Sequence, residues 1–145
     1  MSFNELRNGR VSITHQEYLI TFVTKNRKRI FTDLQTCSTA INEILDLKEG
    51  VWLAWVLMPD HFHGLIRLGS LTLAQEIGRC KSKSAIKVNQ HLKSQGELWQ
   101  TSFYDRALRD ESEQLKVARY IVANPLRAKL VGEITDYPYW NSSWL

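Results

Sequence analysis

Cysteine, proline and glycine are scarce in this chain of 145 residues, which contains two, three and seven of them, respectively. Cys37 and Cys80 have neither the spacing of a metal site nor the density of a disulfide-stabilised secreted scaffold, so two free thiols are expected. No internal repeat, low-complexity tract or linker divides the chain. The sequence therefore predicts a single domain over residues 1–145, long enough to bury a core.

Long hydrophobic runs are also absent. The longest covers Val51 to Met58, far short of the roughly 20 residues that a membrane-spanning helix needs. The first ten residues, MSFNELRNGR, lack the apolar core of a signal peptide. With 43% hydrophobic and 10% aromatic residues, the composition is that of a globular protein and not of a disordered one. A soluble cytoplasmic protein is expected.

Positive charge is in modest excess and unevenly distributed, with a net charge of +4 and an isoelectric point near 9.2. One short segment carries Lys25, Arg27, Lys28 and Arg29, and a second carries Arg79, Lys81, Lys83, Lys87 and Lys93 with no acid among them. Such clusters are typical of surfaces that bind a polyanion. Each cluster alone is equally typical of a solvated face, so charge does not decide between the two.

Alternating β-forming residues bounded by turn residues predict four strands. They cover residues 18–24, 51–58, 61–68 and about 98–108. Pro59 and Asp60 connect the second and third strands, which are expected to be antiparallel neighbours because the connection is so short. The aromatic tail ITDYPYWNSSWL is expected to pack as an irregular segment.

Three helices are predicted between these strands. The first begins at Asp33 as N-cap and ends near Gly50, the second covers about residues 71–92, and the third ends near Asn124. The order of elements predicts an α+β fold, an antiparallel β-sheet flanked by helices. The inward positions are expected to be Leu34, Cys37, Ile41, Ile44 and Leu45 in the first helix, and Leu73, Ile77, Cys80, Ser84, Val88 and Leu92 in the second.

His61 and His63 flank Phe62 within the third predicted strand. Because a strand alternates its faces, both imidazoles project from one side while Phe62 enters the core on the other. Two neutral imidazoles held side by side supply two ligands for a divalent metal ion. Taken alone, a His-x-His pair is more often solvated or hydrogen-bonded than metal-binding.

Tyr120 and Asn124 lie four residues apart on the third predicted helix, so they share one of its faces. Tyr120 is expected to point away from the core, because a separate face is apolar. On this helix alone, the simpler interpretation is an amphipathic tyrosine and an asparagine that caps the helix before Pro125. The apolar face consists of Leu115, Ala118, Ile121 and Val122, and Asp110 and Ser112 are candidate N-caps.

Three longer segments resemble a known protein family. The strings AWVLMPDHFHGLI, LWQTSFYDRALR and ARYIVANPLRAKLV are similar to signature blocks of the transposases of single-strand insertion sequences, which are HUH DNA endonucleases of the single-tyrosine type. They resemble most the REP-associated tyrosine transposase branch, over about residues 15–143. The resemblance implies the ferredoxin-like sandwich of HUH endonucleases, with the paired histidines on a central strand of the sheet.

The resemblance also implies an activity: metal-dependent cleavage and transfer of single DNA strands at hairpin-forming DNA such as extragenic palindromes. Tyr120 is then the nucleophile that forms a 5′-phosphotyrosine and releases a 3′-hydroxyl. His61, His63 and Asn124 are then the ligands of a divalent cation, Mg²⁺ in the cell with Mn²⁺ as a substitute. Asp60 is either a hydrogen-bond partner of His61 or a turn residue.

Cations elsewhere in the chain are candidates for holding single-stranded or hairpin DNA by its phosphates. Tyr104 and Trp99 are candidates for stacking on unpaired bases, although Trp99 is the better core residue. The family includes monomers and homodimers, and both states are open for this chain. The candidate cations are Lys25, Arg27, Lys28, Arg29, Arg79, Lys83, Lys87, Arg106 and Arg109.

Two alternatives use the same residues: a hairpin-binding relative that does not cut, and a metal-dependent hydrolase with water as nucleophile. The complete set of His61, His63, Tyr120 and Asn124 disfavours the first, and Tyr120 disfavours the second. The chain departs from the family pattern at Lys129, where glycine is common, so the turn after the last helix is expected to differ.

Overall fold

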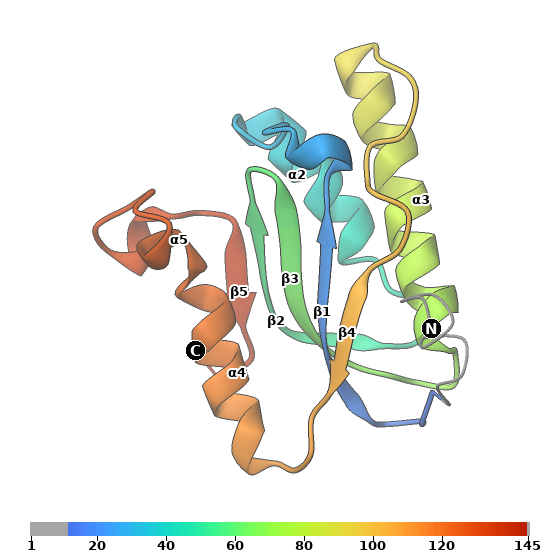
Figure 1. Cartoon of the computed structure of the whole chain (residues 1–145), viewed down its shortest axis with the longest axis vertical. Helices are drawn as coiled ribbons and strands as arrows, with labels where there is room; N and C mark the ends of the chain where they lie inside the picture. The colour runs from blue at the N-terminus through green and yellow to red at the C-terminus, as the bar shows by residue number, and fades with distance from the viewer. Residues whose placement is uncertain (1–11, 145) are drawn as a thin grey trace.

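The computed structural model describes residues 12–144, which form one antiparallel sheet with helices on both of its faces (Figure 1). The five strands lie in the order β4-β1-β3-β2-β5, so β3 is central. This arrangement confirms the predicted α+β class. The strands are β1 Glu17–Val23, β2 Val51–Met58, β3 His61–Arg67, β4 Tyr104–Ala107 and β5 Trp140–Ser142.

Helices α2 and α3 cover one face of the sheet and α4 covers the other (Figure 1). Within residues 12–144, no helix is long and apolar enough to cross a membrane. The segment on which the expectation about a signal peptide rests lies outside the described residues. The helices are α2 Leu34–Ile44, α3 Leu73–Leu92, α4 Ser112–Val122 and α5 Asn124–Arg127, with the 3-10 turns η1 Lys25–Arg27 and η2 Ile134–Asp136.

Strands β2 and β3 form the predicted hairpin, which places the paired histidines in the middle of the sheet. Met58 pairs with His61 on one side of β3, and Thr21 of β1 pairs with His63 on the other. Phe62 is completely buried in the core beneath α2 and α3. The two imidazoles therefore project to the face that α4 covers, as strand alternation predicts.

Each face of the sheet has its own apolar core. The larger core, under α2 and α3, contains an aromatic group of Phe22, Phe31, Phe62 and Trp99. In the smaller core, Val117, Ala118 and Ile121 of α4 pack on residues of β2 and β3 such as Val56 and Leu65. The smaller core lies on the face of the sheet that carries the two histidines. The apolar face of α4 therefore holds α4 on the same face as His61 and His63.

Helix α2 begins as predicted but ends earlier. Asp33 is confirmed as the N-cap, because its carboxylate accepts a hydrogen bond from the Thr36 backbone N–H at 2.9 Å. The helix ends at Ile44 and not near Gly50. Leu34 and Leu45 are exposed, contrary to the prediction: Leu34 lies on the outer side of the first turn, and Leu45 follows the last helical residue. The buried positions are Thr36, Cys37, Ala40 and Ile44.

Helix α3 keeps the predicted inward stripe except at its last residue. A capping box of Thr72 and Gln75 begins the helix. The stripe includes Ser84, whose buried hydroxyl accepts a hydrogen bond from the Trp99 indole at 2.9 Å, which confirms Trp99 as a core residue. Leu92 was expected inside but is 42% exposed at the end of the helix.

The two cysteines are buried free thiols, as predicted. Burial raises the pKa of the Cys37 thiol to about 11 and that of the Cys80 thiol to about 12. Both thiols are therefore protonated and unreactive at neutral pH, as expected of structural cysteines.

Glu76 is a completely buried carboxylate on α3 that organises the turn before β2. It accepts hydrogen bonds from the backbone N–H groups of Lys48 and Glu49 at 2.9 Å each, and from that of Gly50. We expect Glu76→Ala to lower the free energy of unfolding by about 3 kcal/mol, because three backbone N–H groups lose their buried acceptor. Urea unfolding measures this loss. Equal stability of Glu76→Ala and the exposed control Glu133→Ala would contradict it.

Two boundaries in the last third of the chain differ from the predictions. The fourth strand covers only Tyr104–Ala107, and Trp99 contributes a single isolated bridge to Thr24. The tail is not wholly irregular, because β5 pairs with the edge of β2. The Tyr137 hydroxyl donates to the Leu57 carbonyl at 2.6 Å and fastens the tail to the sheet. Three residues are too few for an alternating pattern, so β5 could not be predicted from periodicity.

Helix α4 ends at Val122 and the short helix α5 follows with Pro125 in its first turn, as the proline predicts. The N-cap of α4 is Glu111 and not Asp110 or Ser112 as predicted, and Asp110 instead accepts a hydrogen bond from the Ser112 backbone N–H at 2.9 Å in the turn before the helix. The apolar face is turned slightly from the predicted one. Val117 is buried and Leu115 is 38% exposed.

Candidate active site

His61 and His63 lie edge to face on β3, with ring centroids 4.7 Å apart. Asp60 Oδ1 lies 2.7 Å from His61 Nδ1, and Thr21 Oγ1 lies 2.7 Å from His63 Nδ1. These contacts engage the Nδ1 atom of each ring and fix its orientation. The Nε2 atoms are consequently the positions from which the pair can bind a metal ion.

Both imidazoles are kept neutral by their surroundings. Burial, reinforced by the nearby positive charges of Arg127 and Arg27, lowers the pKa of His63 to about 3. Burial also lowers the pKa of His61, and the hydrogen bond to the Asp60 carboxylate offsets part of this shift. Neutral imidazoles retain the nitrogen lone pairs that a metal ligand needs.

Asp60 is both a turn residue and a hydrogen-bond partner of His61, so the two interpretations of this residue given by the sequence are compatible. Its other carboxylate oxygen, Oδ2, lies 3.3 Å from Arg27 Nε. Its backbone carbonyl accepts hydrogen bonds from the Thr24 backbone N–H at 2.9 Å and from the Thr24 hydroxyl at 3.2 Å. The turn that carries Asp60 is thus bonded to η1 through both main chain and side chain.

Tyr120 points out of α4 and is 55% exposed, as predicted. The Arg127 guanidinium lies over its ring, with the guanidinium carbon 3.8 Å from the ring centroid. Arg127 also donates to the Tyr120 carbonyl at 2.7 Å. The positive charge of Arg127 also contributes to the lowered pKa of His63.

A shallow cavity of about 420 Å³ adjoins Tyr120 on the same face of the sheet. Leu19 of β1, which pairs with Leu65 of β3, forms its floor. Arg106 of β4 and Lys116 of α4 supply two cations to its wall. Glu113, which pairs with Arg106 at 3.3 Å, also lines the cavity, so two cations and one acid surround it.

Asn124 begins α5 and is half-buried. Its side-chain nitrogen donates to the Ile121 carbonyl at 3.1 Å, which leaves the amide oxygen as the atom for a metal. The segment packs against β2, the neighbour of β3. Among the described residues, no three histidine, cysteine or acidic side chains cluster as a metal site, so an ion here would use the imidazoles and an amide.

The predicted DNA-binding cations of η1 surround the turn that carries Asp60. Lys25 pairs with Glu97 at 3.2 Å and Arg27 pairs with Asp60, while Lys28 and Arg29 are exposed. They lie at the end of the sheet where β3 begins, close to His61. Their assignment to DNA stays a prediction.

The cations of α3 lie on the opposite face of the sheet from the histidines. Lys83 Nζ lies 2.6 Å from Asp46 Oδ2 and 3.3 Å from Glu43 Oε2, and Arg79 also pairs with Asp46 at 3.6 Å. The hydrogen bond to Asp46 raises the pKa of Lys83. Lys87 is exposed. These pairs show that Arg79 and Lys83 already have acidic partners, which the sequence, with no acid nearby, did not indicate.

Arg106 and Arg109 both contact Glu113. The Arg106 guanidinium lies 3.3 Å from one carboxylate oxygen, and the Arg109 backbone N–H donates to the other. Arg106 is therefore held beside the Tyr120 cavity, whereas the Arg109 contact uses the main chain. Tyr104, the candidate for base stacking, is 68% exposed on the edge strand β4.

Two residues of the site carry no signal in the sequence. Thr21 becomes a partner of His63 only through the pairing of β1 with β3. Arg127 lies beyond the break before Pro125, so helical periodicity from Tyr120 does not extend to it.

Lys129, where the family commonly has glycine, adopts a left-handed backbone with φ of 58°. The turn that glycine favours is thus formed here by lysine.

Comparison with known proteins gives one family and two related folds. The family model described as "Transposase IS200 like" matches residues 12–124. A REP-associated tyrosine transposase of Escherichia coli (strain K12) is 24% identical over 86 residues, which are 59% of this chain and 50% of that protein. The chain thus spans about half the length of this curated relative.

Two solved structures share the fold. The structure of a REP-associated tyrosine transposase bound to a REP hairpin has a TM-score of 0.69 and 22% identity, covering 90% of this chain and 79% of its own. A putative transposase from Deinococcus radiodurans has a TM-score of 0.56 and 23% identity, covering 78% and 93%, respectively. At these identities the likeness establishes the architecture of the chain.

Proposed function

The chain belongs to the family of IS200-like transposases. We propose that it is a metal-dependent single-strand DNA endonuclease and strand transferase. Its proposed substrate is hairpin-forming DNA such as extragenic palindromes. The observation that supports this most is that α4, which carries Tyr120, packs on the same face of the sheet to which His61 and His63 project. These are the parts that cleavage by a tyrosine requires.

Tyr120 is the proposed nucleophile. Its phenolic oxygen attacks the scissile phosphorus, so a bond from phosphorus to tyrosine forms as the bond to the 3′-oxygen breaks. The phenol gives up its proton and the departing 3′-oxygen takes one up, leaving a 5′-phosphotyrosine and a 3′-hydroxyl. The covalent link keeps the energy of the phosphodiester, so another 3′-hydroxyl can reverse the step without ATP.

The donor set fits a divalent cation held by His61, His63 and Asn124. Among residues 12–144, the neutral imidazoles form hydrogen bonds through Nδ1 and the asparagine amide through its nitrogen. Two nitrogens and one oxygen suit Mn²⁺ well, and Mg²⁺ is the proposed ion in the cell. When bound, such an ion polarises the scissile phosphate and orients it for attack.

A covalent trap tests the proposal. The full chain, incubated with Mg²⁺ or Mn²⁺ and a labelled hairpin oligonucleotide with unpaired flanks, should give an adduct that survives denaturing electrophoresis. Hairpin binding without an adduct or cleavage would indicate a non-catalytic binding protein. Cleavage without an adduct would indicate water as the nucleophile.

We expect Arg127→Ala to slow adduct formation by about ten- to a hundredfold while oligonucleotide binding changes much less. The guanidinium both stacks on the Tyr120 ring and holds the Tyr120 carbonyl, so its loss frees the ring from its position. Single-turnover kinetics separate the rate of adduct formation from affinity. Arg127→Lys should restore part of the rate.

Lys129→Ala is the matched control, because it removes the same charge two residues away without contacting the ring. Its adduct rate should stay near that of the wild type. Equal rates for Arg127→Ala and Lys129→Ala would rule out the positioning role of Arg127.

We expect the two basic segments to contribute unequally to DNA affinity. Arg29→Ala should make the slope of log affinity against log salt shallower by about 0.7, the value for one neutralised phosphate of single-stranded DNA. Lys83→Ala should change the slope less, because Asp46 and Glu43 already neutralise this ammonium. Fluorescence anisotropy at several salt concentrations measures both slopes. A larger change for Lys83→Ala would place the DNA along α3 instead.

A further inference from the structure

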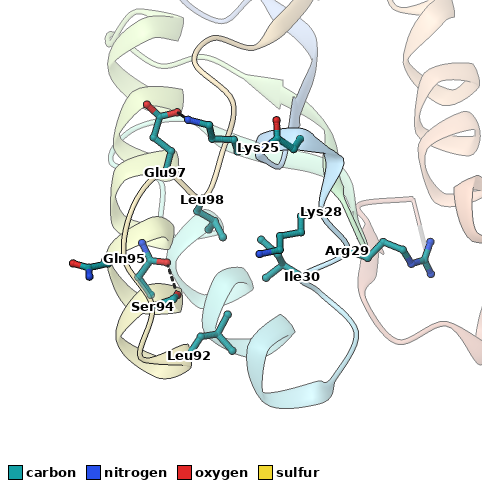
Figure 2. Close-up of a pocket in the computed structure, with 11 residues that line it drawn as sticks. Lys25, Lys28, Arg29, Ile30, Leu92, Ser94, Gln95, Glu97 and Leu98 are labelled. Atoms are coloured by element: carbon teal, nitrogen blue, oxygen red, sulfur yellow. Dashed lines mark hydrogen bonds and ion pairs between the residues drawn. The ribbon is translucent and has the colours of Figure 1, made fainter.

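A pocket of about 380 Å³ opens between η1 and the carboxyl end of α3, outside the site described above (Figure 2). Lys25, Lys28 and Ile30 line it from the η1 side, and Asn89, Leu92 and Leu98 line it from the α3 side. Figure 2 shows the Arg29 side chain extending away from this group. The volume lies within the range of about 300–1,000 Å³ that is usual for small-molecule sites.

The walls of this pocket are held in place by hydrogen bonds. The Lys25 backbone N–H donates to the Leu98 carbonyl at 2.9 Å, and the Lys25 ammonium pairs with Glu97 at 3.2 Å. The Asn89 side chain donates to the Gly96 carbonyl at 3.0 Å, and Gly96 has a φ of 96° that glycine adopts without strain. The loop after α3 is therefore shaped independently of any ligand, and the pocket is preformed.

The lining combines an apolar wall with a cationic rim. Ile30 and Leu92 supply accessible apolar surface, and Leu98, which is 3% exposed, borders it. Leu92 is thus exposed at the end of an otherwise buried stripe because it lines this pocket. Lys25 and Lys28 supply positive charge, and only one acid, Glu97, lines the pocket beside them. A flat apolar body joined to an anion matches this lining, and a nucleotide has that chemistry.

The pocket is linked directly to the histidine pair. The Thr24 hydroxyl donates to the Lys28 carbonyl at 2.7 Å and to the Asp60 carbonyl at 3.2 Å, and Asp60 in turn holds His61. Arg27, which belongs to the same short turn, pairs with the Asp60 carboxylate. Thr24, Arg27 and Asp60 thus connect the histidine pair to the η1 side of the pocket.

We propose that this pocket holds one unpaired nucleotide of the DNA substrate, with its base against Leu92, Ile30 and Leu98 and its phosphate beside Lys28. The inference rests on the proposed function and adds to it a nucleotide site apart from the cleavage centre. Such a site fixes the distance along the strand between the hairpin and the scissile phosphate, because the unpaired segment is held at a second point.

Fluorescence of a base analogue tests the pocket. Hairpin oligonucleotides carry 2-aminopurine at each unpaired position in turn and are bound to the full chain in the presence of EDTA, so that no strand is cut. We expect one position to change its emission on binding. Lys28→Glu and Leu92→Gln should abolish that change and weaken affinity for the tailed hairpin by about ten-fold, the effect of one lost contact to a charged group. Affinity for a blunt hairpin should not change.

Matched controls are Lys48→Glu and Ile86→Gln, which repeat the same substitutions at exposed positions outside the pocket. Both should keep the emission change and the affinity. Loss of affinity in Lys28→Glu with no emission change at any position would mean a phosphate contact only and overturn the nucleotide site. Adduct formation with no emission change also overturns it while leaving the proposed function intact. Absence of DNA binding and of adducts overturns both.

Discussion

Tyr120→Phe is expected to abolish the covalent protein–DNA adduct and strand cleavage while leaving affinity for a hairpin oligonucleotide within a few-fold of the wild type. The substitution removes the attacking oxygen and nothing else. The phenyl ring still offers its face to the Arg127 guanidinium, so the local packing of α4 and α5 is kept. Denaturing electrophoresis of a labelled hairpin measures the adduct, and anisotropy measures the affinity.

The chain offers a matched control for this experiment in Tyr104, which is exposed at 68% on β4. Tyr104→Phe should form the adduct at the wild-type rate. Tyr137 is not a competing nucleophile, because it is buried and donates its hydroxyl to the Leu57 carbonyl, and burial raises its pKa. An adduct in Tyr120→Phe that disappears in Tyr104→Phe would therefore assign the reaction to β4.

The double substitution of His61 and His63 by alanine is expected to abolish cleavage that depends on a divalent ion. It should also abolish the Mn²⁺ binding that calorimetry is expected to detect in the wild type. Both rings point to the α4 face and are held through Nδ1, so the variant loses the two nitrogen ligands but none of the larger core under α2 and α3. Far-ultraviolet circular dichroism should show the sheet and helices unchanged. The calorimetric readout is independent of activity.

His91 provides the control for the histidine variants, since it is exposed on α3. His91→Ala should bind Mn²⁺ and cut DNA as the wild type does. Equal Mn²⁺ binding by the wild type and by the double variant of His61 and His63 would eliminate the proposed metal site, whatever happened to cleavage.

Periodic and local signals accounted for most of the fold. The hairpin around Pro59 and Asp60, the N-cap at Asp33 and the helix end before Pro125 each depend on neighbouring residues, and each is present. The prediction that Leu34 and Leu45 face inward is wrong, because hydrophobicity alone does not show which turns of α2 pack on the rest of the protein. The edge strand β5 is stabilised by its pairing with β2, which the sequence does not encode locally.

In the candidate site, too, local patterns predicted some features and tertiary contacts determine others. Alternation in β3 predicted correctly that His61 and His63 share a face, and the spacing in α4 predicted that Tyr120 is exposed. The hydrogen bond between Thr21 and His63, which are 42 residues apart in the sequence, requires the register of β1 against β3. The stacking of Arg127 on Tyr120 crosses a break between helices. Contacts of this kind follow from tertiary arrangement and have no periodic pattern.

Gly64, which follows His63 directly, has no side chain because the Trp52 ring occupies that space. A Cβ atom at residue 64 would lie 2.7 Å from Trp52 Cε3, and the indole cannot yield easily since it donates to the Ile44 carbonyl at 2.9 Å. The Cβ atom would also lie 2.9 Å from Phe62 Cε1, so among homologous sequences a larger residue at 64 should occur only where the residues at 52 and 62 leave room for it. The glycine in the string HFHG is thus explained by the size of its aromatic neighbours. A motif search that requires this glycine would miss relatives that keep both histidines.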